Sequence, residues 1–154
     1  MNERDLYRKV MRDLNNPLAI EALQLGTMPG RFVKPRDGLG TANDGSTVRV
    51  GNPIDLYWTT DCLEMKVVKA RTRKGLTFKA DTAFGNLQRV EMEKYNALLG
   101  VGFILSDNEK NDRLIAIYVI RFWKLRETNN AAIIMDWFDH EAEYTIKGEA
   151  YGKI

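Results

Sequence analysis

The stretch IDLYWTTDCLEMKVVKA, residues 54–70, contains the two clearest strand patterns in the chain. Residues 54–59 and 62–70 are rich in β-branched, aromatic and other apolar side chains, which favour strands. The polar pair Thr60-Asp61 between them predicts a tight turn. The two patterns together predict an antiparallel hairpin, and we expect the rest of the fold to be built around it.

Alternation along the second strand separates polar from apolar side chains. Successive side chains of a strand point to opposite faces, so Glu64 and Lys66 should share one face. Leu63 and Met65 should then point to the other face, toward the core. When the hairpin closes, Asp55 falls opposite the Glu64 to Lys66 segment, within reach of a cross-strand neighbour. The pattern therefore predicts that two carboxylates and one ammonium group meet.

Two facing carboxylates are unfavourable unless a cation lies between them, and Mg²⁺ prefers oxygen ligands. We expect Asp55, Glu64 and the main-chain carbonyl of Met65 to bind the ion, which leaves positions for a phosphate oxygen and a water. Lys66 would position or deprotonate that water, or offset charge in the transition state. The chemistry this favours is phosphodiester hydrolysis. An exposed Glu–Lys pair is the alternative explanation of the Glu-x-Lys pattern by itself.

The flanking segments predict an α/β fold with a central mixed β-sheet flanked by helices. Expected helices span residues 2–14, 18–25 and 86–99, with Gly100 as the stop of the third. Expected strands span residues 31–34, 76–80, 101–106 and 114–120. Residues 29–51 otherwise form a long loop, and residues 122–140 predict one or two helices broken near Asn129-Asn130, so that the chain ends in helices.

Length and composition bound the architecture. With 154 residues, of which 44% are hydrophobic, the chain fits one domain (1–154), with a core at about 2–120 and a C-terminal extension at about 121–154. Its apolar runs are too short to span a bilayer, and no signal-peptide pattern is present, so we expect a cytoplasmic protein without membrane contact. One cysteine and one histidine exclude an intramolecular disulfide and a Cys/His zinc site.

Charge is distributed unevenly along the chain. Residues 66–79 contain six basic side chains and no acidic one, although the formal net charge is only +2. Such a stripe predicts a face that binds phosphates, and a solvated hairpin tip is the alternative. The candidate DNA-binding residues, which include basic positions of the long loop, are Arg31, Lys34, Arg36, Lys69, Arg71, Arg73, Lys74 and Lys79.

Asp55, followed nine residues later by Glu64-Met65-Lys66 on two consecutive apolar strands, resembles the signature of the PD-(D/E)XK nuclease superfamily. This resemblance implies a restriction-endonuclease-like core with the element order αβββαβ. The metal implied is Mg²⁺, with Mn²⁺ able to substitute, and no small-molecule cofactor is implied.

Further positions resemble the Holliday-junction resolvases of this superfamily, namely the archaeal and RecU-type enzymes. Glu3 in the first helix would be a metal ligand, and Gln88 near the start of the helix expected at residues 86–99 would be a catalytic residue. The glycine-containing loop before Asp55 and the basic hairpin after Lys66 also match. A first-turn Glu that complements the helix dipole and a Gln that caps its helix are the alternatives.

The resemblance implies a structure-selective endonuclease that cuts branched or duplex DNA as a homodimer, in the host cytoplasm if a phage encodes it. The VRR-NUC branch shares the early Glu and the Gln, so a flap or nonspecific nuclease is an alternative within the same chemistry. A non-catalytic DNA-binding module that assists recombination is an alternative from another class. Together, Asp55, Glu64 and Lys66 favour an enzyme, because a degenerate site would be expected to have lost at least one of them.

Overall fold

The computed structural model describes residues 3–14, 17–23, 38–41, 47–50, 56–57, 62–80, 82–94, 97–107, 111–128 and 132–152. Its helices are α1 (Glu3–Leu14), α2 (Pro17–Ala22), α3 (Asn86–Lys94), α4 (Phe122–Glu127) and α5 (Met135–Glu141), with a 3₁₀ turn η1 (Arg73–Gly75). Its strands are β1 (Gly38–Thr41), β2 (Thr47–Val50), β3 (Leu56–Tyr57), β4 (Cys62–Ala70), β5 (Thr77–Lys79), β6 (Leu98–Ser106), β7 (Asp112–Arg121), β8 (Ala132–Ile134) and β9 (Tyr144–Lys147).

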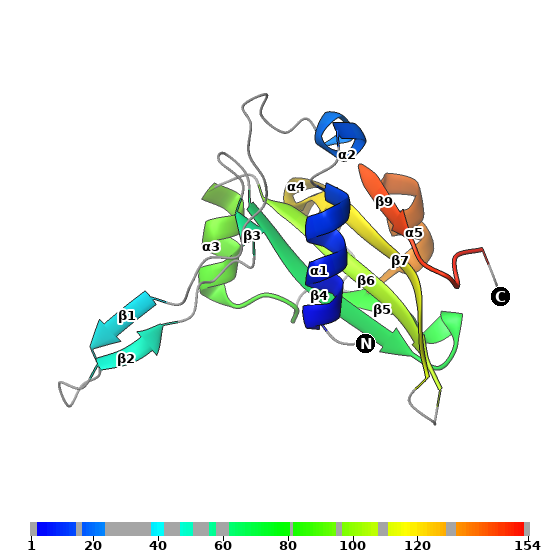
Figure 1. The fold of residues 1–154 in the computed structure, drawn as a ribbon, viewed down its shortest axis with the longest axis horizontal. Helices are drawn as coiled ribbons and strands as arrows, with labels where there is room; N and C mark the ends of the chain where they lie inside the picture. The colour runs from blue at the N-terminus through cyan, green and yellow to red at the C-terminus, as the bar shows by residue number, and fades with distance from the viewer. Residues whose placement is uncertain are drawn as a thin grey trace.

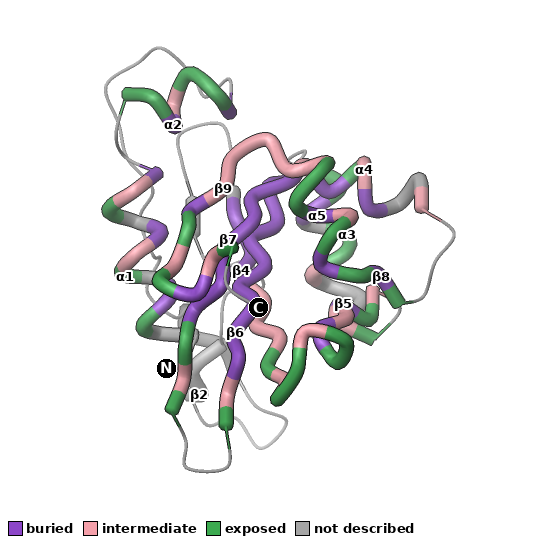
Figure 2. Tube along the Cα trace, turned by 90° about the vertical axis from the view of Figure 1, so that its right-hand side faces the viewer, coloured by how far each residue is buried: buried purple, intermediate pink, exposed green. Residues whose placement is uncertain are grey.

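The central sheet has the strand order β3-β4-β6-β7-β9. The β4–β6 pair is parallel and the other three pairs are antiparallel, so the sheet is mixed. Figure 1 shows α1 lying across one face of the sheet, and Figure 2 shows α3, α4 and α5 on the other side. The prediction of a mixed α/β fold with a central sheet flanked by helices is confirmed.

Each face of the sheet has its own hydrophobic core. On the α1 face, Leu6 and Val10 pack with Leu63 and Met65 of β4. On the opposite face the core is largely aromatic, and it contains Phe78, Phe84, Phe103, Tyr118, Phe122 and Phe138. Burying a large apolar side chain contributes about 1.5–3 kcal/mol, so both layers stabilise the sheet that carries β4.

The helix predicted at residues 86–99 ends earlier than expected, because α3 stops at Lys94 and β6 begins at Leu98. Gly100 is a strand residue of β6 and does not terminate a helix. A Cβ at Gly100 would lie 2.5 Å from Sδ of Met65, so a larger residue there would require the Met65 side chain to shift. Leu98 is buried in the core under α1, and Leu99 is buried in the core on the opposite face. Two consecutive apolar residues also fit the end of a helix, so the sequence pattern did not identify a strand here.

The region predicted as a long loop contains a hairpin. β1 pairs antiparallel with β2, with Leu39 opposite Arg49, and Figure 1 shows this hairpin apart from the central sheet. The β-branched residues Thr47, Val48 and Val50 favour a strand, and the glycine-rich composition masked that preference. The strand predicted at residues 31–34 lies outside the described residues.

The C-terminal region contains two helices, as predicted, with α4 ending before Asn129-Asn130 and α5 starting after it. The expectation that the chain ends in helices is wrong, because β8 pairs with β5 and β9 pairs with β7 in the central sheet. Asp139 of α5 accepts hydrogen bonds from the hydroxyls of Tyr118 (3.0 Å) and Tyr151 (2.9 Å). Burial and the hydrogen bond to Asp139 raise the pKa of Tyr118, so its hydroxyl stays a donor.

No helix in the described parts of the chain has the length and apolar character that crossing a membrane requires.

Candidate functional site

The antiparallel pairing that the sequence predicts within residues 54–70 is present at residues 56–57 and 62–63, while residues 54–55 and 58–61 lie outside the described residues. β3 pairs antiparallel with β4, with Leu56 opposite Leu63 and Tyr57 opposite Cys62. Asp55 precedes Leu56 in the sequence and lies outside the described residues, so its position opposite Glu64 stays a prediction. The pairing of Leu56 with Leu63 places β3 beside the start of β4, where Glu64 is located.

β4 divides its side chains between the two faces of the sheet as predicted. Leu63 and Met65 are fully buried in the core beneath α1. Glu64 and Lys66 share the other face, where α3 lies. Glu64 is only 2% exposed, and it is the one buried charged side chain among the described residues. A buried carboxylate is costly without hydrogen bonds, so its partners determine whether the site is stable.

Gln88 of α3 connects Glu64 with Lys66. Its Nε2 donates to Oε2 of Glu64 at 2.5 Å, and its Oε1 accepts from Nζ of Lys66 at 3.3 Å. The main-chain N–H of Gly85 also donates to Oε1, at 3.3 Å. Two donors at Oε1 fix the orientation of the amide, and its NH₂ group must then face Glu64. The structure therefore brings together three of the four predicted catalytic residues.

The structure shows the capping contact of Gln88, while its catalytic role stays a prediction. α3 begins at Asn86, so Gln88 is the third residue of the helix and Gly85 precedes its first. A Gln at this place commonly caps the helix by accepting the N–H of the residue before it, which is the contact with Gly85. The cap also aims the amide of Gln88 at Glu64.

Phe84 is a site residue that sequence reasoning missed. Nζ of Lys66 lies 5.3 Å from the centroid of the Phe84 ring, a cation–π arrangement. The ring is itself held edge-on by Phe78 and Phe122. Lys66 is therefore positioned from two sides, by the Gln88 amide and by an aromatic face. The only signal in the sequence is an aromatic residue just before the start of α3.

A groove of about 360 Å³ begins at Lys66 and runs between β4 and the segment 77–83. Its lining includes Lys66, Lys69, Lys79 and the hydroxyl-bearing Thr77 and Thr82. No acidic residue is among the described residues that line it. The groove therefore offers positive charge and hydroxyl donors next to Lys66, which Gln88 joins to Glu64.

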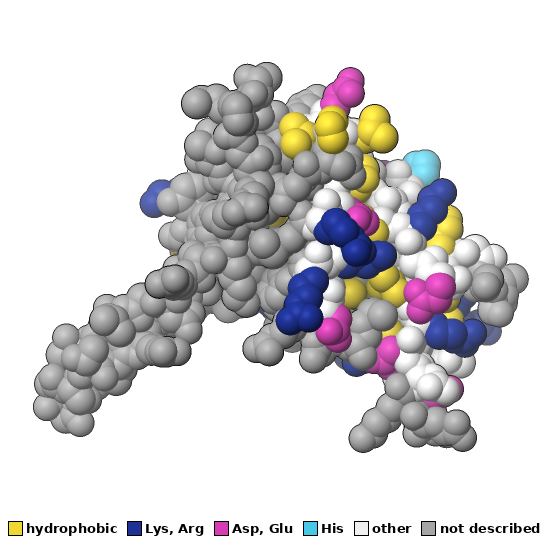
Figure 3. All heavy atoms as spheres, in the orientation of Figure 1, with side chains coloured by type: hydrophobic (Ala, Val, Ile, Leu, Met, Phe, Trp, Pro, Cys, Tyr) yellow, Lys and Arg dark blue, Asp and Glu magenta, His cyan; other side chains and the backbone are white. Residues whose placement is uncertain are grey.

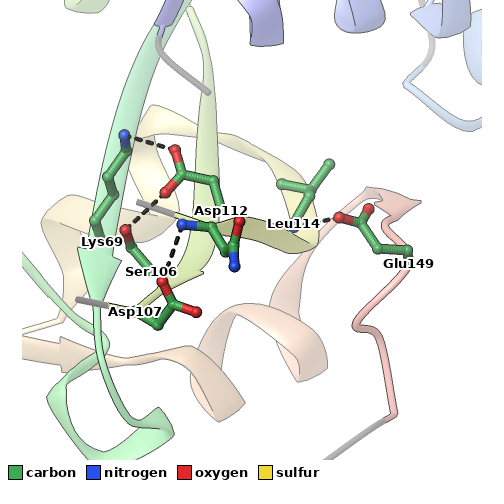
Figure 4. Close-up of polar contacts among 7 residues, drawn as sticks. Lys69, Ser106, Asp107, Asp112, Leu114 and Glu149 are labelled. Atoms are coloured by element: carbon green, nitrogen blue, oxygen red, sulfur yellow. Dashed lines mark hydrogen bonds and ion pairs between the residues drawn. The ribbon is translucent and has the colours of Figure 1, made fainter. Parts of the chain in front are cut away.

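Lys69 differs from the other groove lysines because it has an acidic partner. Figure 4 shows its Nζ directed at the Asp112 carboxylate, 3.1 Å away, while Oγ of Ser106 donates to the same carboxylate at 2.6 Å. This ion pair joins the end of β4 to the β6–β7 hairpin. The DNA contact of Lys69 remains a prediction, and the pairing with Asp112 reduces the charge that Lys69 offers to the groove.

The other predicted DNA-binding residues are distributed over several places. Arg71 and Lys74 are exposed, and Arg73 and Lys74 line a second hollow of about 470 Å³ together with Asp136. Arg31, Lys34 and Arg36 lie outside the described residues. Figure 3 shows basic and acidic side chains interspersed over the described part of the α1 face, so the charge seen there is mixed.

Glu3 is the first residue of α1. This helix packs through Leu6 and Val10 on the face of the sheet that carries Leu63 and Met65. Glu64 is on the other face, so the structure does not bring α1 to the face that carries Glu64 and Gln88. The predicted role of Glu3 as a metal ligand remains a prediction.

The donor set suits a hard cation in part. Within the described ranges, no three Asp, Glu, His or Cys side chains gather into a metal-binding group. Glu64 supplies the carboxylate oxygen that Mg²⁺ prefers, and it lies at the position in β4 where the hairpin predicts the ion. Asp55 and the carbonyl of Met65 stay the predicted ligands that would complete the set.

Comparison with known protein families and with curated proteins gives no match to this sequence. The resemblance to PD-(D/E)XK nucleases therefore rests on the motif residues and on the order of elements.

Loss of the Gln88 side chain should weaken both the fold and the site. In Gln88→Ala, buried Glu64 loses a hydrogen-bond donor, and we expect the free energy of unfolding to fall by about 1–3 kcal/mol. Chemical denaturation measures this change. Val90→Ala is the matched control, because Val90 is on the same helix and 61% exposed, and it should change stability by no more than about 0.5 kcal/mol. Equal stabilities of the two variants would contradict the bridging role of Gln88.

Proposed function

We propose that this protein is a Mg²⁺-dependent DNA endonuclease, a phosphodiester hydrolase that acts on branched DNA. The observation that carries the proposal is the buried carboxylate of Glu64, which the Gln88 amide joins to Lys66, a residue that lines the groove together with Lys69 and Lys79. A buried carboxylate and a positioned ammonium beside a groove that also contains Lys79 suit a reaction on an anionic phosphodiester.

The order of elements supports a restriction-endonuclease-like core. α1, the β3–β4 hairpin, β5, α3 and β6 follow one another in the chain, which is compatible with an αβββαβ order. β4 carries Glu64 and Lys66. It pairs in parallel with β6, the middle strand of the central sheet. β5 departs from a single-sheet arrangement, because it pairs with β8 in a separate two-stranded sheet.

Each residue of the site has a part in the proposed reaction. Gln88 holds the carboxylate of Glu64 in one orientation, and Glu64 with Asp55 and the Met65 carbonyl would hold the ion. Bound there, Mg²⁺ would supply Lewis-acid polarisation of a phosphoryl oxygen. The Lys66 ammonium, kept between Gln88 and Phe84, would offset negative charge that develops on the phosphate or orient the attacking water.

The choice of branched DNA rests on the resemblance to Holliday-junction resolvases at Glu3, at the glycine-containing loop, at the basic segment and at Gln88. A four-way junction has two-fold symmetry, so a homodimer with two active sites would cut symmetry-related strands. Action on DNA in the cytoplasm is part of the same proposal.

Cleavage assays on DNA of defined shape test the proposal. Four-way junction, 5′-flap, single-stranded and linear duplex DNA are each incubated with protein in Mg²⁺, in Mn²⁺ and in EDTA. We expect the junction to be cut fastest in Mg²⁺, cleavage to persist in Mn²⁺, and EDTA to abolish it.

Preferential cleavage of the flap would replace the resolvase assignment with a flap nuclease and keep the chemistry. Binding without cleavage of any DNA in Mg²⁺ or Mn²⁺ would overturn the enzymatic proposal in favour of a DNA-binding module. Cleavage by Asp55→Asn at the wild-type rate would contradict the expected metal ligands.

A further inference from the structure

The groove beside Lys66 lies along an edge of β4. Four consecutive residues of this strand, 66–69, line it, so the groove follows the strand itself and not only one of its faces. On one side β4 pairs with β6 along residues 63–70, and on the other side it pairs with β3 only at Cys62 and Leu63 among the described residues. A strand edge presents main-chain N–H groups, which are donors for anionic oxygens.

The opposite wall comes from a different sheet. β5 pairs with β8 and not with β4, so Thr77 and Lys79 border the groove from across a gap. Lys79 is exposed, and no ion pair joins it to any described residue. Thr82 adds an exposed hydroxyl-bearing side chain to that of the half-buried Thr77. The wall thus adds an ammonium and two hydroxyls to the donors of the β4 edge.

The described lining residues offer no open aromatic face on which a base could stack. Phe78, the aromatic residue among them, is 2% exposed and packs edge-on against Phe84 and Phe138. Proteins that hold single strands through their bases present open aromatic faces for stacking. The chemistry of this groove, with ammonium, hydroxyl and main-chain N–H groups, matches phosphate and sugar oxygens instead.

We propose that this groove binds the sugar–phosphate backbone of the cleaved strand next to the scissile phosphate, through phosphate contacts centred on Lys79 and without contacts to bases. The inference rests on the proposed nuclease function, and it specifies the part of the substrate that the site holds. It also assigns different roles to the lysines of the basic segment, residues 66–79. Lys66 serves the reacting phosphate, Lys79 holds the neighbouring backbone, and Lys69 is tied to Asp112.

Binding measurements in the absence of cleavage test the groove. Glu64→Gln protein is titrated onto a fluorescein-labelled single-stranded oligonucleotide at several salt concentrations. Adding Lys79→Ala should weaken binding about 3-fold or more at low salt and lower the slope of log K against log salt by about 0.7. Lys79→Arg should restore the slope. Lys147→Ala, an exposed lysine of β9 at the far edge of the sheet, is the charge-matched control and should change neither value.

An abasic oligonucleotide of the same length separates backbone contacts from base contacts. We expect it to bind with an affinity comparable to that of the normal strand, whereas stacking would make it weaker by about ten-fold for each stacked base. Three results would each overturn the groove assignment. The Glu64→Gln protein could fail to bind the oligonucleotide, Lys79→Ala and Lys147→Ala could weaken binding equally, or the abasic strand could bind with much lower affinity. If wild-type protein cleaves no DNA but these binding results hold, the endonuclease proposal fails and the groove remains.

Discussion

Glu64→Gln is expected to slow DNA cleavage by on the order of 10³-fold, about 4 kcal/mol in activation free energy, without unfolding the protein. The substitution keeps the size of the side chain and a hydrogen-bonding oxygen for Gln88, but it removes the negative charge that would hold the cation. Stability should stay the same or rise, because a buried charge is replaced by a neutral group of similar shape. Single-turnover cleavage of a four-way junction in Mg²⁺ measures the rate, and thermal unfolding measures the stability.

Glu141→Gln provides the matched control, since it makes the same chemical change in α5, away from β4. It should cleave at the wild-type rate. Wild-type cleavage by Glu64→Gln would show that the buried carboxylate has no part in the reaction. A loss of cleavage accompanied by an equal loss of folded protein would instead assign Glu64 a structural role.

Gly148→Ala is expected to lower the free energy of unfolding by about 3 kcal/mol, the largest stability effect that we anticipate for a single methyl group. A Cβ at Gly148 would overlap the main-chain carbonyl of Leu114. That carbonyl accepts from the N–H of Ala150 at 2.9 Å, and the N–H of Gly148 itself donates to the carbonyl of Ile115 at 2.8 Å. The turn after β9 therefore lies directly against β7, and main-chain atoms cannot rotate away as a side chain would.

Gly85→Ala is the control for this prediction, because a Cβ at Gly85 would meet nothing within 4 Å. Because alanine is a poorer residue than glycine before the first turn of a helix, its stability should fall by no more than about 1 kcal/mol. Denaturant titration of the two variants gives the comparison. If Gly148→Ala is as stable as Gly85→Ala, the close approach of residues 114 and 148 is not a constraint on the fold.

The parts of the fold that the sequence predicts correctly depend on neighbours in the chain. The β3–β4 hairpin and α1 follow from alternation and helical spacing within short windows. β8 and β9 were missed because each is only three or four residues long and is stabilised by a distant strand, β5 or β7. Leu98 to Gly100 were assigned to the wrong element because apolar residues buried on both faces of a sheet lack the alternation that identifies a half-buried strand.

In the candidate site, too, features set by neighbours in the chain could be predicted, and features set by distant packing could not. Glu64 and Lys66 could be paired from their spacing on one strand, and Gln88 could be added from the resemblance at the start of its helix. Phe84 and the groove could not be predicted, because they depend on how α3 and β5 pack against β4. Lys69 was predicted to contact DNA, but only the folded chain shows that its ammonium group is paired with Asp112.

The pairing of β5 with β8 affects the order in which this protein can be assembled. Lys79, on the wall of the groove, stands opposite Ala132 in the ladder, so the strand that carries it gains its partner only after much more of the chain has been synthesised. At about 5–20 residues per second, the β4 edge and α3 leave the ribosome seconds before β8 does. A nascent chain can then join Glu64 to Gln88 before the groove beside Lys66 has a second wall.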